Sequence, residues 1–381
     1  MAGARGVRAD RHHDSHALLL QTVHNPPTRS ARIDAVIVPT SRPYTYLRDA
    51  ARLARELRCQ LVVLCSGWAG AERSCDLASE YGVDAVAVDV GGSPAPMPEF
   101  RTTLLLEAVE RGLFDRKTDT SLKRNIGLAL STMMDWQLVL FLDDDIHVGN
   151  AGHIREAAAL AETYAAVGLV NYGFPDNSVV CHAYRKVGGA QGTFIGGGAM
   201  VVQVKAANSF FPSIYNEDWF FLLDGQRIAP VAMAGKVDQK EYDPFRNADR
   251  ARGEELGDTL AEGIYALLDD GKDVGAADLD YWRSYLQIRR DFIQHVLDRM
   301  PRAAVKVENE RDRMVVALKG AQGRSLRITP ELCVDYLRAW TADRQVWRRY
   351  LRRQQSHPTA AAALRSLGLH PHTSILPRDQ R

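Results

Sequence analysis

The chain has 381 residues, a length that suits one large domain with an extension better than three separate domains. Its 46% hydrophobic and 25% charged residues are ordinary for a globular protein with a sizeable core. A formal net charge of +1 argues against a dedicated nucleic-acid-binding protein, and no apolar stretch approaches the roughly 18 residues that span a bilayer. The five cysteines lack CxxC spacing, which favours reduced thiols. We therefore expect a cytoplasmic protein without a membrane span.

Both ends of the chain lack apolar periodicity. Residues 1–30 combine Arg, His, Asp and Pro, which predicts a mobile tail. Three histidines in this tail, His12, His13 and His16, are of a residue type that binds metals, but a solvated tail accounts better for the composition. Residues 356–381 are predicted to form a second mobile tail.

Short apolar runs alternate with helical patterns along the first half of the chain. The runs lie at 33–38, 61–65, 84–88 and 138–142, with further strands expected near 168–172 and 198–202, and the helical patterns lie at 47–57, 70–81 and 121–134. Nearly continuous apolar strands that alternate with helices are typical of a parallel sheet covered on both faces. The first half therefore predicts an α/β fold.

The second half changes character after residue 245. From Arg246 onward, apolar residues recur every three or four positions, which predicts helices. We divide the ordered chain into an α/β region, 31–245, and a helical region, 246–355. The helical region should pack on the α/β region, because its apolar faces are too large to leave in water.

Three adjacent aspartates, Asp143, Asp144 and Asp145, follow the apolar strand at 138–142. Open α/β sheets bind ligands at the carboxyl ends of their strands, and carboxylates beside an apolar strand are costly unless something pairs with them. A Mg²⁺ or Mn²⁺ ion would remove their repulsion and accept oxygen ligands. In an extended segment Asp143 and Asp145 share a face, so we predict these two as metal ligands, with Asp144 pointing away. The alternative is an acidic surface turn, or a helix N-terminus before Ile154.

A short hydrophobic strand that runs into an Asp-x-Asp motif, after a Rossmann-like half, resembles the GT-A glycosyltransferases. The resemblance covers roughly residues 33–245. It implies a mostly parallel sheet flanked by helices, with residues 246–355 as a C-terminal helical extension. It also implies a Mn²⁺ or Mg²⁺ ion on the aspartates that holds the diphosphate of a nucleotide-sugar donor, and we assign Asp144 to the donor side.

Two further segments agree with this resemblance. The loop Pro39-Thr40-Ser41-Arg42 follows the first strand, where such enzymes cradle the nucleotide, although an ordinary turn in which Ser41 caps the next helix is the alternative. Lys123-Arg124-Asn125 resembles the basic pattern of family-two-like glycosyltransferases at this place in the chain. Its positive charge would help to neutralise a diphosphate, and a solvated basic helix face is the alternative.

The segment Asn216-Glu217-Asp218-Trp219 resembles the acidic acceptor-side motif of inverting family-two-like enzymes, in which the aspartate is the general base. An acceptor hydroxyl is a poor nucleophile at neutral pH, and a positioned carboxylate that takes its proton answers that need. The resemblance therefore implies a catalytic role for Asp218, with Glu217 beside it. The alternative is a helix N-terminus, where acidic residues are favoured by the helix dipole.

The metal's third protein ligand departs from the family pattern. Many GT-A enzymes use a later histidine, but no histidine lies between Asp218 and His295. The segment 237–245 offers the replacements, and we take Gln239 as the predicted ligand, with Asp238 and Glu241 as alternatives.

The function implied by these motifs is transfer of a sugar from a UDP- or GDP-sugar to a hydroxyl of a small-molecule or glycan acceptor. Asp218 favours inversion over retention at the anomeric carbon. A sugar-nucleotide-forming nucleotidyltransferase is the alternative enzyme, but the loop at 39–42 lacks the glycines that such enzymes carry after their first strand. A non-catalytic nucleotide-sugar-binding protein is the alternative from another class. The sequence leaves a homo-oligomer open.

Overall fold

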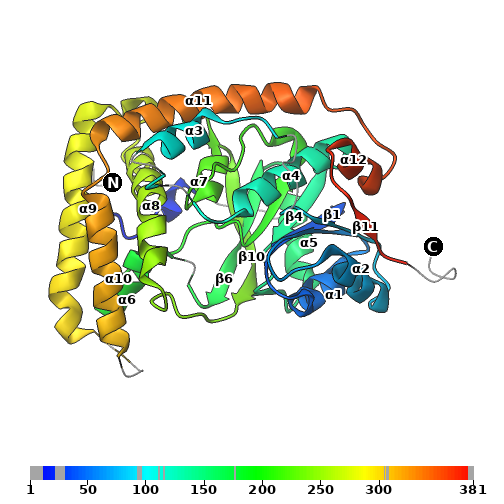
Figure 1. Ribbon diagram of the computed structural model, residues 1–381, viewed down its shortest axis with the longest axis horizontal. Helices are drawn as coiled ribbons and strands as arrows, with labels where there is room; N and C mark the ends of the chain where they lie inside the picture. The colour runs from blue at the N-terminus through cyan, green and yellow to red at the C-terminus, as the bar shows by residue number, and fades with distance from the viewer. Residues whose placement is uncertain are drawn as a thin grey trace, which may run out of the picture.

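The computed structural model describes residues 12–21, 31–91, 97–109, 112–114, 116–175, 177–303, 305 and 309–375. Within these residues the chain forms a mixed α/β fold around one large, mostly parallel sheet flanked by helices (Figure 1). The α/β class that the sequence predicts is confirmed.

The described strands form a nine-stranded sheet and a two-stranded hairpin. The strands are β1 (Ala35–Thr40), β2 (Gln60–Cys65), β3 (Ala85–Asp89), β4 (Leu138–Leu142), β5 (Ile146–His147), β6 (Ala166–Gly173), β7 (Ala199–Gln203), β8 (Leu223–Asp224), β9 (Arg227–Ile228), β10 (Val231–Gln239) and β11 (His372–Thr373). The large sheet has the order β11-β3-β2-β1-β4-β7-β6-β10-β5. Strands β1, β2, β3, β4, β6 and β10 run in one direction, and β5, β7 and β11 run against them.

Helices cover both faces of this sheet. The α-helices are α1 (Arg48–Leu57), α2 (Ala71–Glu80), α3 (Arg101–Ala108), α4 (Thr120–Met133), α5 (Ala151–Leu160), α6 (Val179–Lys186), α7 (Glu217–Phe221), α8 (Ala248–Asp269), α9 (Leu279–Arg299), α10 (Glu310–Ser325), α11 (Pro330–Arg352) and α12 (Ala360–Ser366). Short 3-10 helices are η1 (Ala17–Leu19), η2 (Tyr44–Leu47), η4 (Val204–Ala206), η5 (Val274–Ala276) and η6 (Met300–Arg302).

The central strands are apolar along most of their length because each faces a core on both sides. In β1, Ala35 and Ile37 belong to a core that also holds residues of α4, α8 and α11, whereas Val36 and Val38 belong to a core with residues of α1, α2 and α5. Successive side chains of a strand point to opposite faces, so two-sided burial removes the polar alternation seen in half-exposed strands.

The C-terminal helices share a core with the sheet, as the sequence predicts. Leu260 of α8 and Trp340 of α11 are fully buried in the same cluster as Phe141 of β4. Helix α11 lies beside α3, whose first backbone N–H groups, those of Arg101 and Thr102, donate to the buried carboxylate of Asp343 at 2.9 and 2.8 Å. Figure 1 shows α9 and α10 at one end of the molecule, and α12 and β11 at the other.

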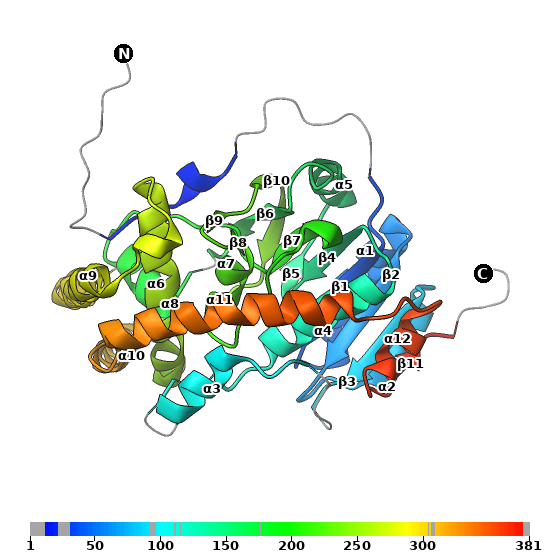
Figure 2. The same ribbon diagram turned by 90° about the horizontal axis from the view of Figure 1, so that it is seen from above.

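Both segments predicted as mobile tails differ from that prediction where the structure describes them. Helix η1 packs against α8 (Figure 2), and His16 just before it is buried. Near the other end, residues 360–366 form α12, and β11 pairs antiparallel with β3 at the edge of the sheet. Such edge pairing uses backbone hydrogen bonds, so it needs no apolar repeat in the sequence. Residues 1–11, 22–30 and 376–381 of the predicted tails lie outside the described residues.

Two expectations from composition have direct structural counterparts. All five cysteines are free and buried, which agrees with reduced thiols. In the described part of the chain, no helix combines the length and the apolarity that a membrane crossing requires.

The helical region contains a buried ion cluster that links α8 to α9. The guanidinium of Arg289 donates from Nε and Nη2 to the carboxylate of Glu255 at 2.9 and 2.8 Å, and from Nη2 to Asp258 at 2.7 Å. All three side chains are buried. We expect Arg289→Leu to lower the free energy of unfolding by about 3–5 kcal/mol, because two buried carboxylates lose their partner. Urea unfolding followed by circular dichroism measures this.

Arg283 on the same helix provides the control. It pairs with Asp280 at 2.6 Å, but both side chains are more than half exposed. Solvent screens such a pair, so Arg283→Leu should change the free energy of unfolding by no more than about 1 kcal/mol. Equal losses in the two variants would contradict the role given to the buried cluster.

Candidate active site

The aspartate cluster lies at the carboxyl end of β4, in a turn. The backbone carbonyl of Asp143 accepts a hydrogen bond from the N–H of Ile146 at 3.1 Å. The prediction that Asp143 and Asp145 share a face, with Asp144 pointing away, assumes an extended backbone. The turn does not have that backbone conformation. All three aspartates line one cleft of about 160 Å³.

The segments predicted to bind the donor line the same cleft as the aspartates. Residues 39–42, which form the end of β1 and the start of the next loop, line it together with Lys123 of α4 and the aspartate cluster. Asp119 and Thr120, at the start of α4, also line it and have no sequence motif that singles them out. The parallel pairing of β1 with β4 explains the arrangement, since both strands end at the same edge of the sheet.

Asp144 and Asp145 share a cationic partner from the β1 loop. Arg42 forms an ion pair with Asp144 and reaches Asp145 with Nη2 at 3.1 Å. The hydroxyl of Thr40 donates to the other oxygen of Asp144 at 2.5 Å. Burial raises the pKa of Asp144, against the opposing influence of Thr40 and Arg42. The turn thus directs Asp144 toward the end of β1 and not away from the cleft.

Asp143 pairs with a different cation. Nη2 of Arg124 lies 3.0 and 3.3 Å from its two carboxylate oxygens. Burial raises the pKa of Asp143 to about 6, and the neighbouring Asp145 and Asp144 add to that rise, while Arg124 opposes it. A divalent cation would relieve this mutual repulsion, so the oxygen-only donor set of Asp143 and Asp145 fits a Mg²⁺ or Mn²⁺ ion.

Glu217 is held in an ion-pair network that disfavours the catalytic role assigned from sequence. Nη1 of Arg124 donates to one carboxylate oxygen at 2.8 Å, and Arg116 pairs with the other. Burial alone would raise the pKa of Glu217, but the two arginines outweigh it and lower the pKa. A carboxylate with both oxygens in ion pairs cannot readily accept a proton from a substrate. Glu217 instead positions Arg124 beside Asp143.

The other two members of the basic motif have structural partners. Nζ of the buried Lys123 donates to the backbone carbonyl of Thr40 at 2.8 Å and to the hydroxyl of Ser66 at 2.7 Å. The amide of Asn125 bonds both the carbonyl and the N–H of Phe211, at 2.8 and 2.9 Å. Lys123 lines the cleft, whereas Asn125 does not and instead holds the backbone of Phe211.

Gln239, the predicted third metal ligand, lies at the end of β10. It is paired with Ile146 of β5, and the N–H of the next residue, Lys240, donates to the carbonyl of Asp145 at 3.0 Å. Its side-chain oxygen, however, accepts a hydrogen bond from Asn171 at 2.5 Å, and it does not line the cleft. Gln239 thus supports the aspartate turn through the sheet, and its side-chain oxygen is engaged with Asn171.

Asp218 is held by two backbone donors. One carboxylate oxygen accepts the N–H of Gly197 at 2.5 Å, and the other accepts the N–H of Trp219 at 3.0 Å. Gly197 also packs against the guanidinium of Arg124, which a Cβ at this position would overlap. Burial raises the pKa of Asp218, and the neighbouring Glu217 raises it further, against Arg124 and the backbone donors. A fixed carboxylate with a raised pKa suits general-base chemistry.

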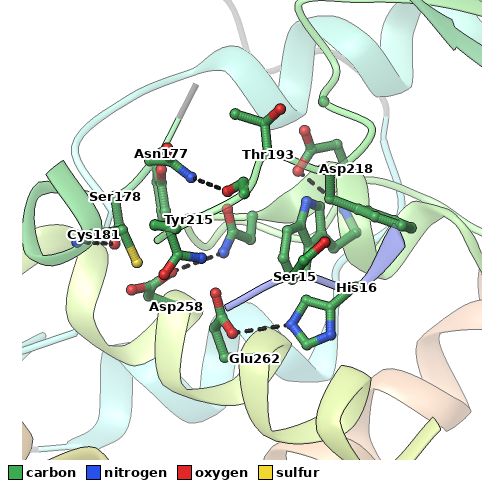
Figure 3. Close-up of a pocket in the computed structure, with 16 residues that line it drawn as sticks. Ser15, His16, Asn177, Ser178, Cys181, Thr193, Tyr215, Asp218, Asp258 and Glu262 are labelled. Carbon is green, nitrogen blue, oxygen red and sulfur yellow. Dashed lines mark hydrogen bonds and ion pairs between the residues drawn. The ribbon is translucent and has the colours of Figure 1, made fainter. Parts of the chain in front are cut away.

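A second cavity, of about 40 Å³, lies beside Asp218 (Figure 3). Asp218 and Trp219 from α7 line one part of it, and Asp258 and Glu262 from α8 line another. The N-terminal segment supplies Ser15 and His16. Sequence patterns did not single out the α8 carboxylates for this site, because their spacing is that of an ordinary helix.

The two cavities lie on either side of a short connection. The carbonyl of Gly198 accepts the N–H of Asp143 at 2.8 Å, and the preceding Gly197 holds Asp218. Arg124 provides a second link, since it contacts both Asp143 and Glu217. The structure therefore places Asp143 and Asp218 on consecutive glycines, Gly198 and Gly197, so that the two cavities are neighbours.

No protein-family profile and no curated protein matches the chain. Among solved structures, the chain is similar to the mannosyltransferase PcManGT from Pyrobaculum calidifontis in complex with GDP-Man and Mn²⁺. The identity is 15%, the match covers 86% of this chain and 90% of that chain, and the TM-score is 0.41. A likeness at this level does not assign a function to this chain.

Proposed function

We propose that the chain is a metal-dependent glycosyltransferase of the GT-A type that moves a sugar from a nucleotide-diphosphate donor to an acceptor hydroxyl. The observation that carries the proposal is the short hydrogen-bonded path from the aspartate cluster through Gly198 and Gly197 to Asp218. Transfer needs the donor and the base within reach of one another, and this path supports that arrangement.

In this proposal the cleft beside β1 and β4 binds the donor. Asp143 and Asp145 would hold a Mn²⁺ or Mg²⁺ ion, which when bound neutralises charge on the diphosphate. The loop at 39–42 lies where the nucleotide would bind. Arg42 forms ion pairs with Asp144 and Asp145 in the structure, and its side chain is 43% exposed, so it has room to turn toward a phosphate.

Asp218 would act as the general base. As the acceptor oxygen attacks the anomeric carbon, its proton passes to a carboxylate oxygen of Asp218. The bond from that carbon to the phosphate oxygen breaks, and the nucleoside diphosphate leaves. Attack from the side opposite the leaving group inverts the anomeric configuration. The backbone N–H groups of Gly197 and Trp219 keep the carboxylate oriented throughout.

A thermal-shift panel of UDP- and GDP-sugars, each with Mn²⁺ and with a chelator, tests the proposal. We expect at least one nucleotide sugar to raise the melting temperature only when Mn²⁺ is present. A ligand at a hundredfold excess over its dissociation constant stabilises the native state by about 2.7 kcal/mol. A panel without any shift, or shifts unaffected by the chelator, would contradict metal-dependent donor binding. Slow hydrolysis of the bound donor would distinguish an enzyme from a non-catalytic binder.

A further inference from the structure

Two histidines of the N-terminal segment converge on one aspartate of α8. Nδ1 of His16 lies 2.5 Å from Oδ2 of Asp269, and Nδ1 of His13 lies 3.5 Å from the same oxygen. One ligand atom from each of the three residues lies within 4.8 Å of the others. Tetrahedral Zn²⁺ with bonds of about 2.0–2.2 Å places its ligand atoms about 3.3 Å apart, so small side-chain shifts would admit the ion.

The second nitrogen of His16 already has the partner that a metal-binding histidine needs. Its Nε2 lies 3.0 Å from a carboxylate oxygen of Glu262 (Figure 3). In the structure Nδ1 also lies within hydrogen-bond distance of Asp269, so the ring donates from both nitrogens. A bound cation would replace the proton on Nδ1, while Nε2 keeps its bond to Glu262. A carboxylate behind the histidine is the usual outer shell of protein zinc sites, because it fixes the ring and its tautomer.

At the same place, Asp269 has one carboxylate oxygen without a hydrogen-bond partner in the described structure. Its side chain is 8% exposed, and that oxygen, Oδ1, is buried. An unpaired buried carboxylate oxygen is costly, and a cation bound by Asp269 would remove that cost. The side chain of His13 is 24% exposed, which leaves a path for the ion and for a water ligand.

We propose that His13, His16 and Asp269 form a zinc-type metal site, separate from the aspartate cluster, with Glu262 as the outer partner of His16. Imidazole nitrogens with one carboxylate suit Zn²⁺ better than Mg²⁺ or Mn²⁺, which prefer oxygen ligands.

The site would fasten the N-terminal segment over the cavity beside Asp218. Ser15 and His16 line that cavity, and the ring of His16 lies 5.3 Å from the ring of Trp219. Leu19 and Leu20 of the segment pack against the main core, whereas Leu18 is 88% exposed. Metal binding would add to these contacts and hold this wall of the cavity in place. Zinc binding itself does not depend on the proposed sugar transfer.

The test uses the full chain, freed of metal with a chelator and then titrated with Zn²⁺ against a chromophoric competitor. Glu262→Gln removes an outer-shell partner and should weaken zinc binding about 10–100-fold. His13→Ala and Asp269→Asn each remove a proposed ligand, so we expect both to weaken zinc binding by more than that. Co²⁺ in place of Zn²⁺ should give the visible absorption of a tetrahedral site. Zn²⁺ should also slow hydrogen exchange in residues 12–21.

Two controls make the result specific. His12 adjoins the site, but its Nε2 bonds Gln191 at 2.6 Å, so His12→Ala should keep the zinc affinity. The double variant Asp143→Asn, Asp145→Asn should also keep it, although it removes the proposed donor-side metal site. Circular dichroism checks that each variant is folded. Unchanged zinc affinity in His13→Ala would overturn the proposal, as would loss of all zinc binding in the double aspartate variant. In the first case the two hydrogen bonds from the ring nitrogens of His16 to Asp269 and Glu262 would be enough to hold the segment.

Discussion

Asp218→Asn should lower the turnover rate by about 10²–10⁴-fold while the affinity for the donor stays nearly unchanged. The amide cannot take the acceptor's proton, whereas the donor cleft is lined by other residues. In the wild-type protein, turnover should fall with decreasing pH as Asp218 becomes protonated. Because the pKa of Asp218 is raised, this loss should begin above the usual range for an aspartate. Steady-state kinetics across pH, with donor affinity from calorimetry, measures both effects.

The structure also sets the control for this variant. Both oxygens of Asp218 accept backbone N–H groups, and an asparagine can offer only one oxygen, so Asp218→Asn also weakens the contact to Gly197 or Trp219. Melting temperatures separate this structural cost from the chemical one. Asp224→Asn, a half-exposed carboxylate soon after α7, should leave turnover within about twofold. Near-normal turnover in Asp218→Asn, with product of retained configuration, would show that Asp218 is not the base.

Glu217→Gln should behave differently from Asp218→Asn. Glu217 carries ion pairs to Arg116 and Arg124, so its neutralisation leaves two cations without their shared partner. The main effects should therefore be a lower melting temperature and weaker donor binding through Arg124, with the pH dependence of turnover retained. The two neighbouring carboxylates would then have separate roles, one in chemistry and one in positioning.

Asp143→Ala and Asp145→Ala should each abolish metal-dependent donor binding while leaving the fold intact. Both carboxylates line the donor cleft and are the proposed ligands of the cation. Arg124 keeps its ion pair with Glu217 when Asp143 is removed, so the network behind the site survives. Calorimetry with the donor and Mn²⁺ tests this, and circular dichroism checks the fold.

A carboxylate outside the cleft provides the comparison for these variants. Asp49 of α1 pairs with Arg52 and His147 at 3.4 and 3.2 Å and does not line the cleft. Asp49→Asn should bind donor and Mn²⁺ as the wild type does. Unchanged affinity in both Asp143→Ala and Asp145→Ala would exclude the aspartate cluster as the metal site.

Much of the fold follows from local sequence patterns. The apolar runs at 33–38, 61–65, 84–88 and 138–142 correspond to β1, β2, β3 and β4, because two-sided burial requires continuous apolar residues. The three- and four-residue repeats after 245 correspond to α8 and the helices that follow. Strand β10 was not predicted, since its segment Val231–Gln239 contains a glycine, a lysine and an irregularity in its pairing with β6.

The sequence by itself determined the α/β architecture and placed Asp143 at the end of a buried strand, because both depend on residues close together in the chain. Only the tertiary structure decided which partners these residues have. Arg124 meets Glu217 across 93 positions, and His16 meets Glu262 across 246. Such contacts leave no periodic signal in either segment. The way the elements pack therefore decides the roles of side chains whose partners are distant in sequence. The amide of Asn125, which hydrogen-bonds the backbone of Phe211, is one such side chain.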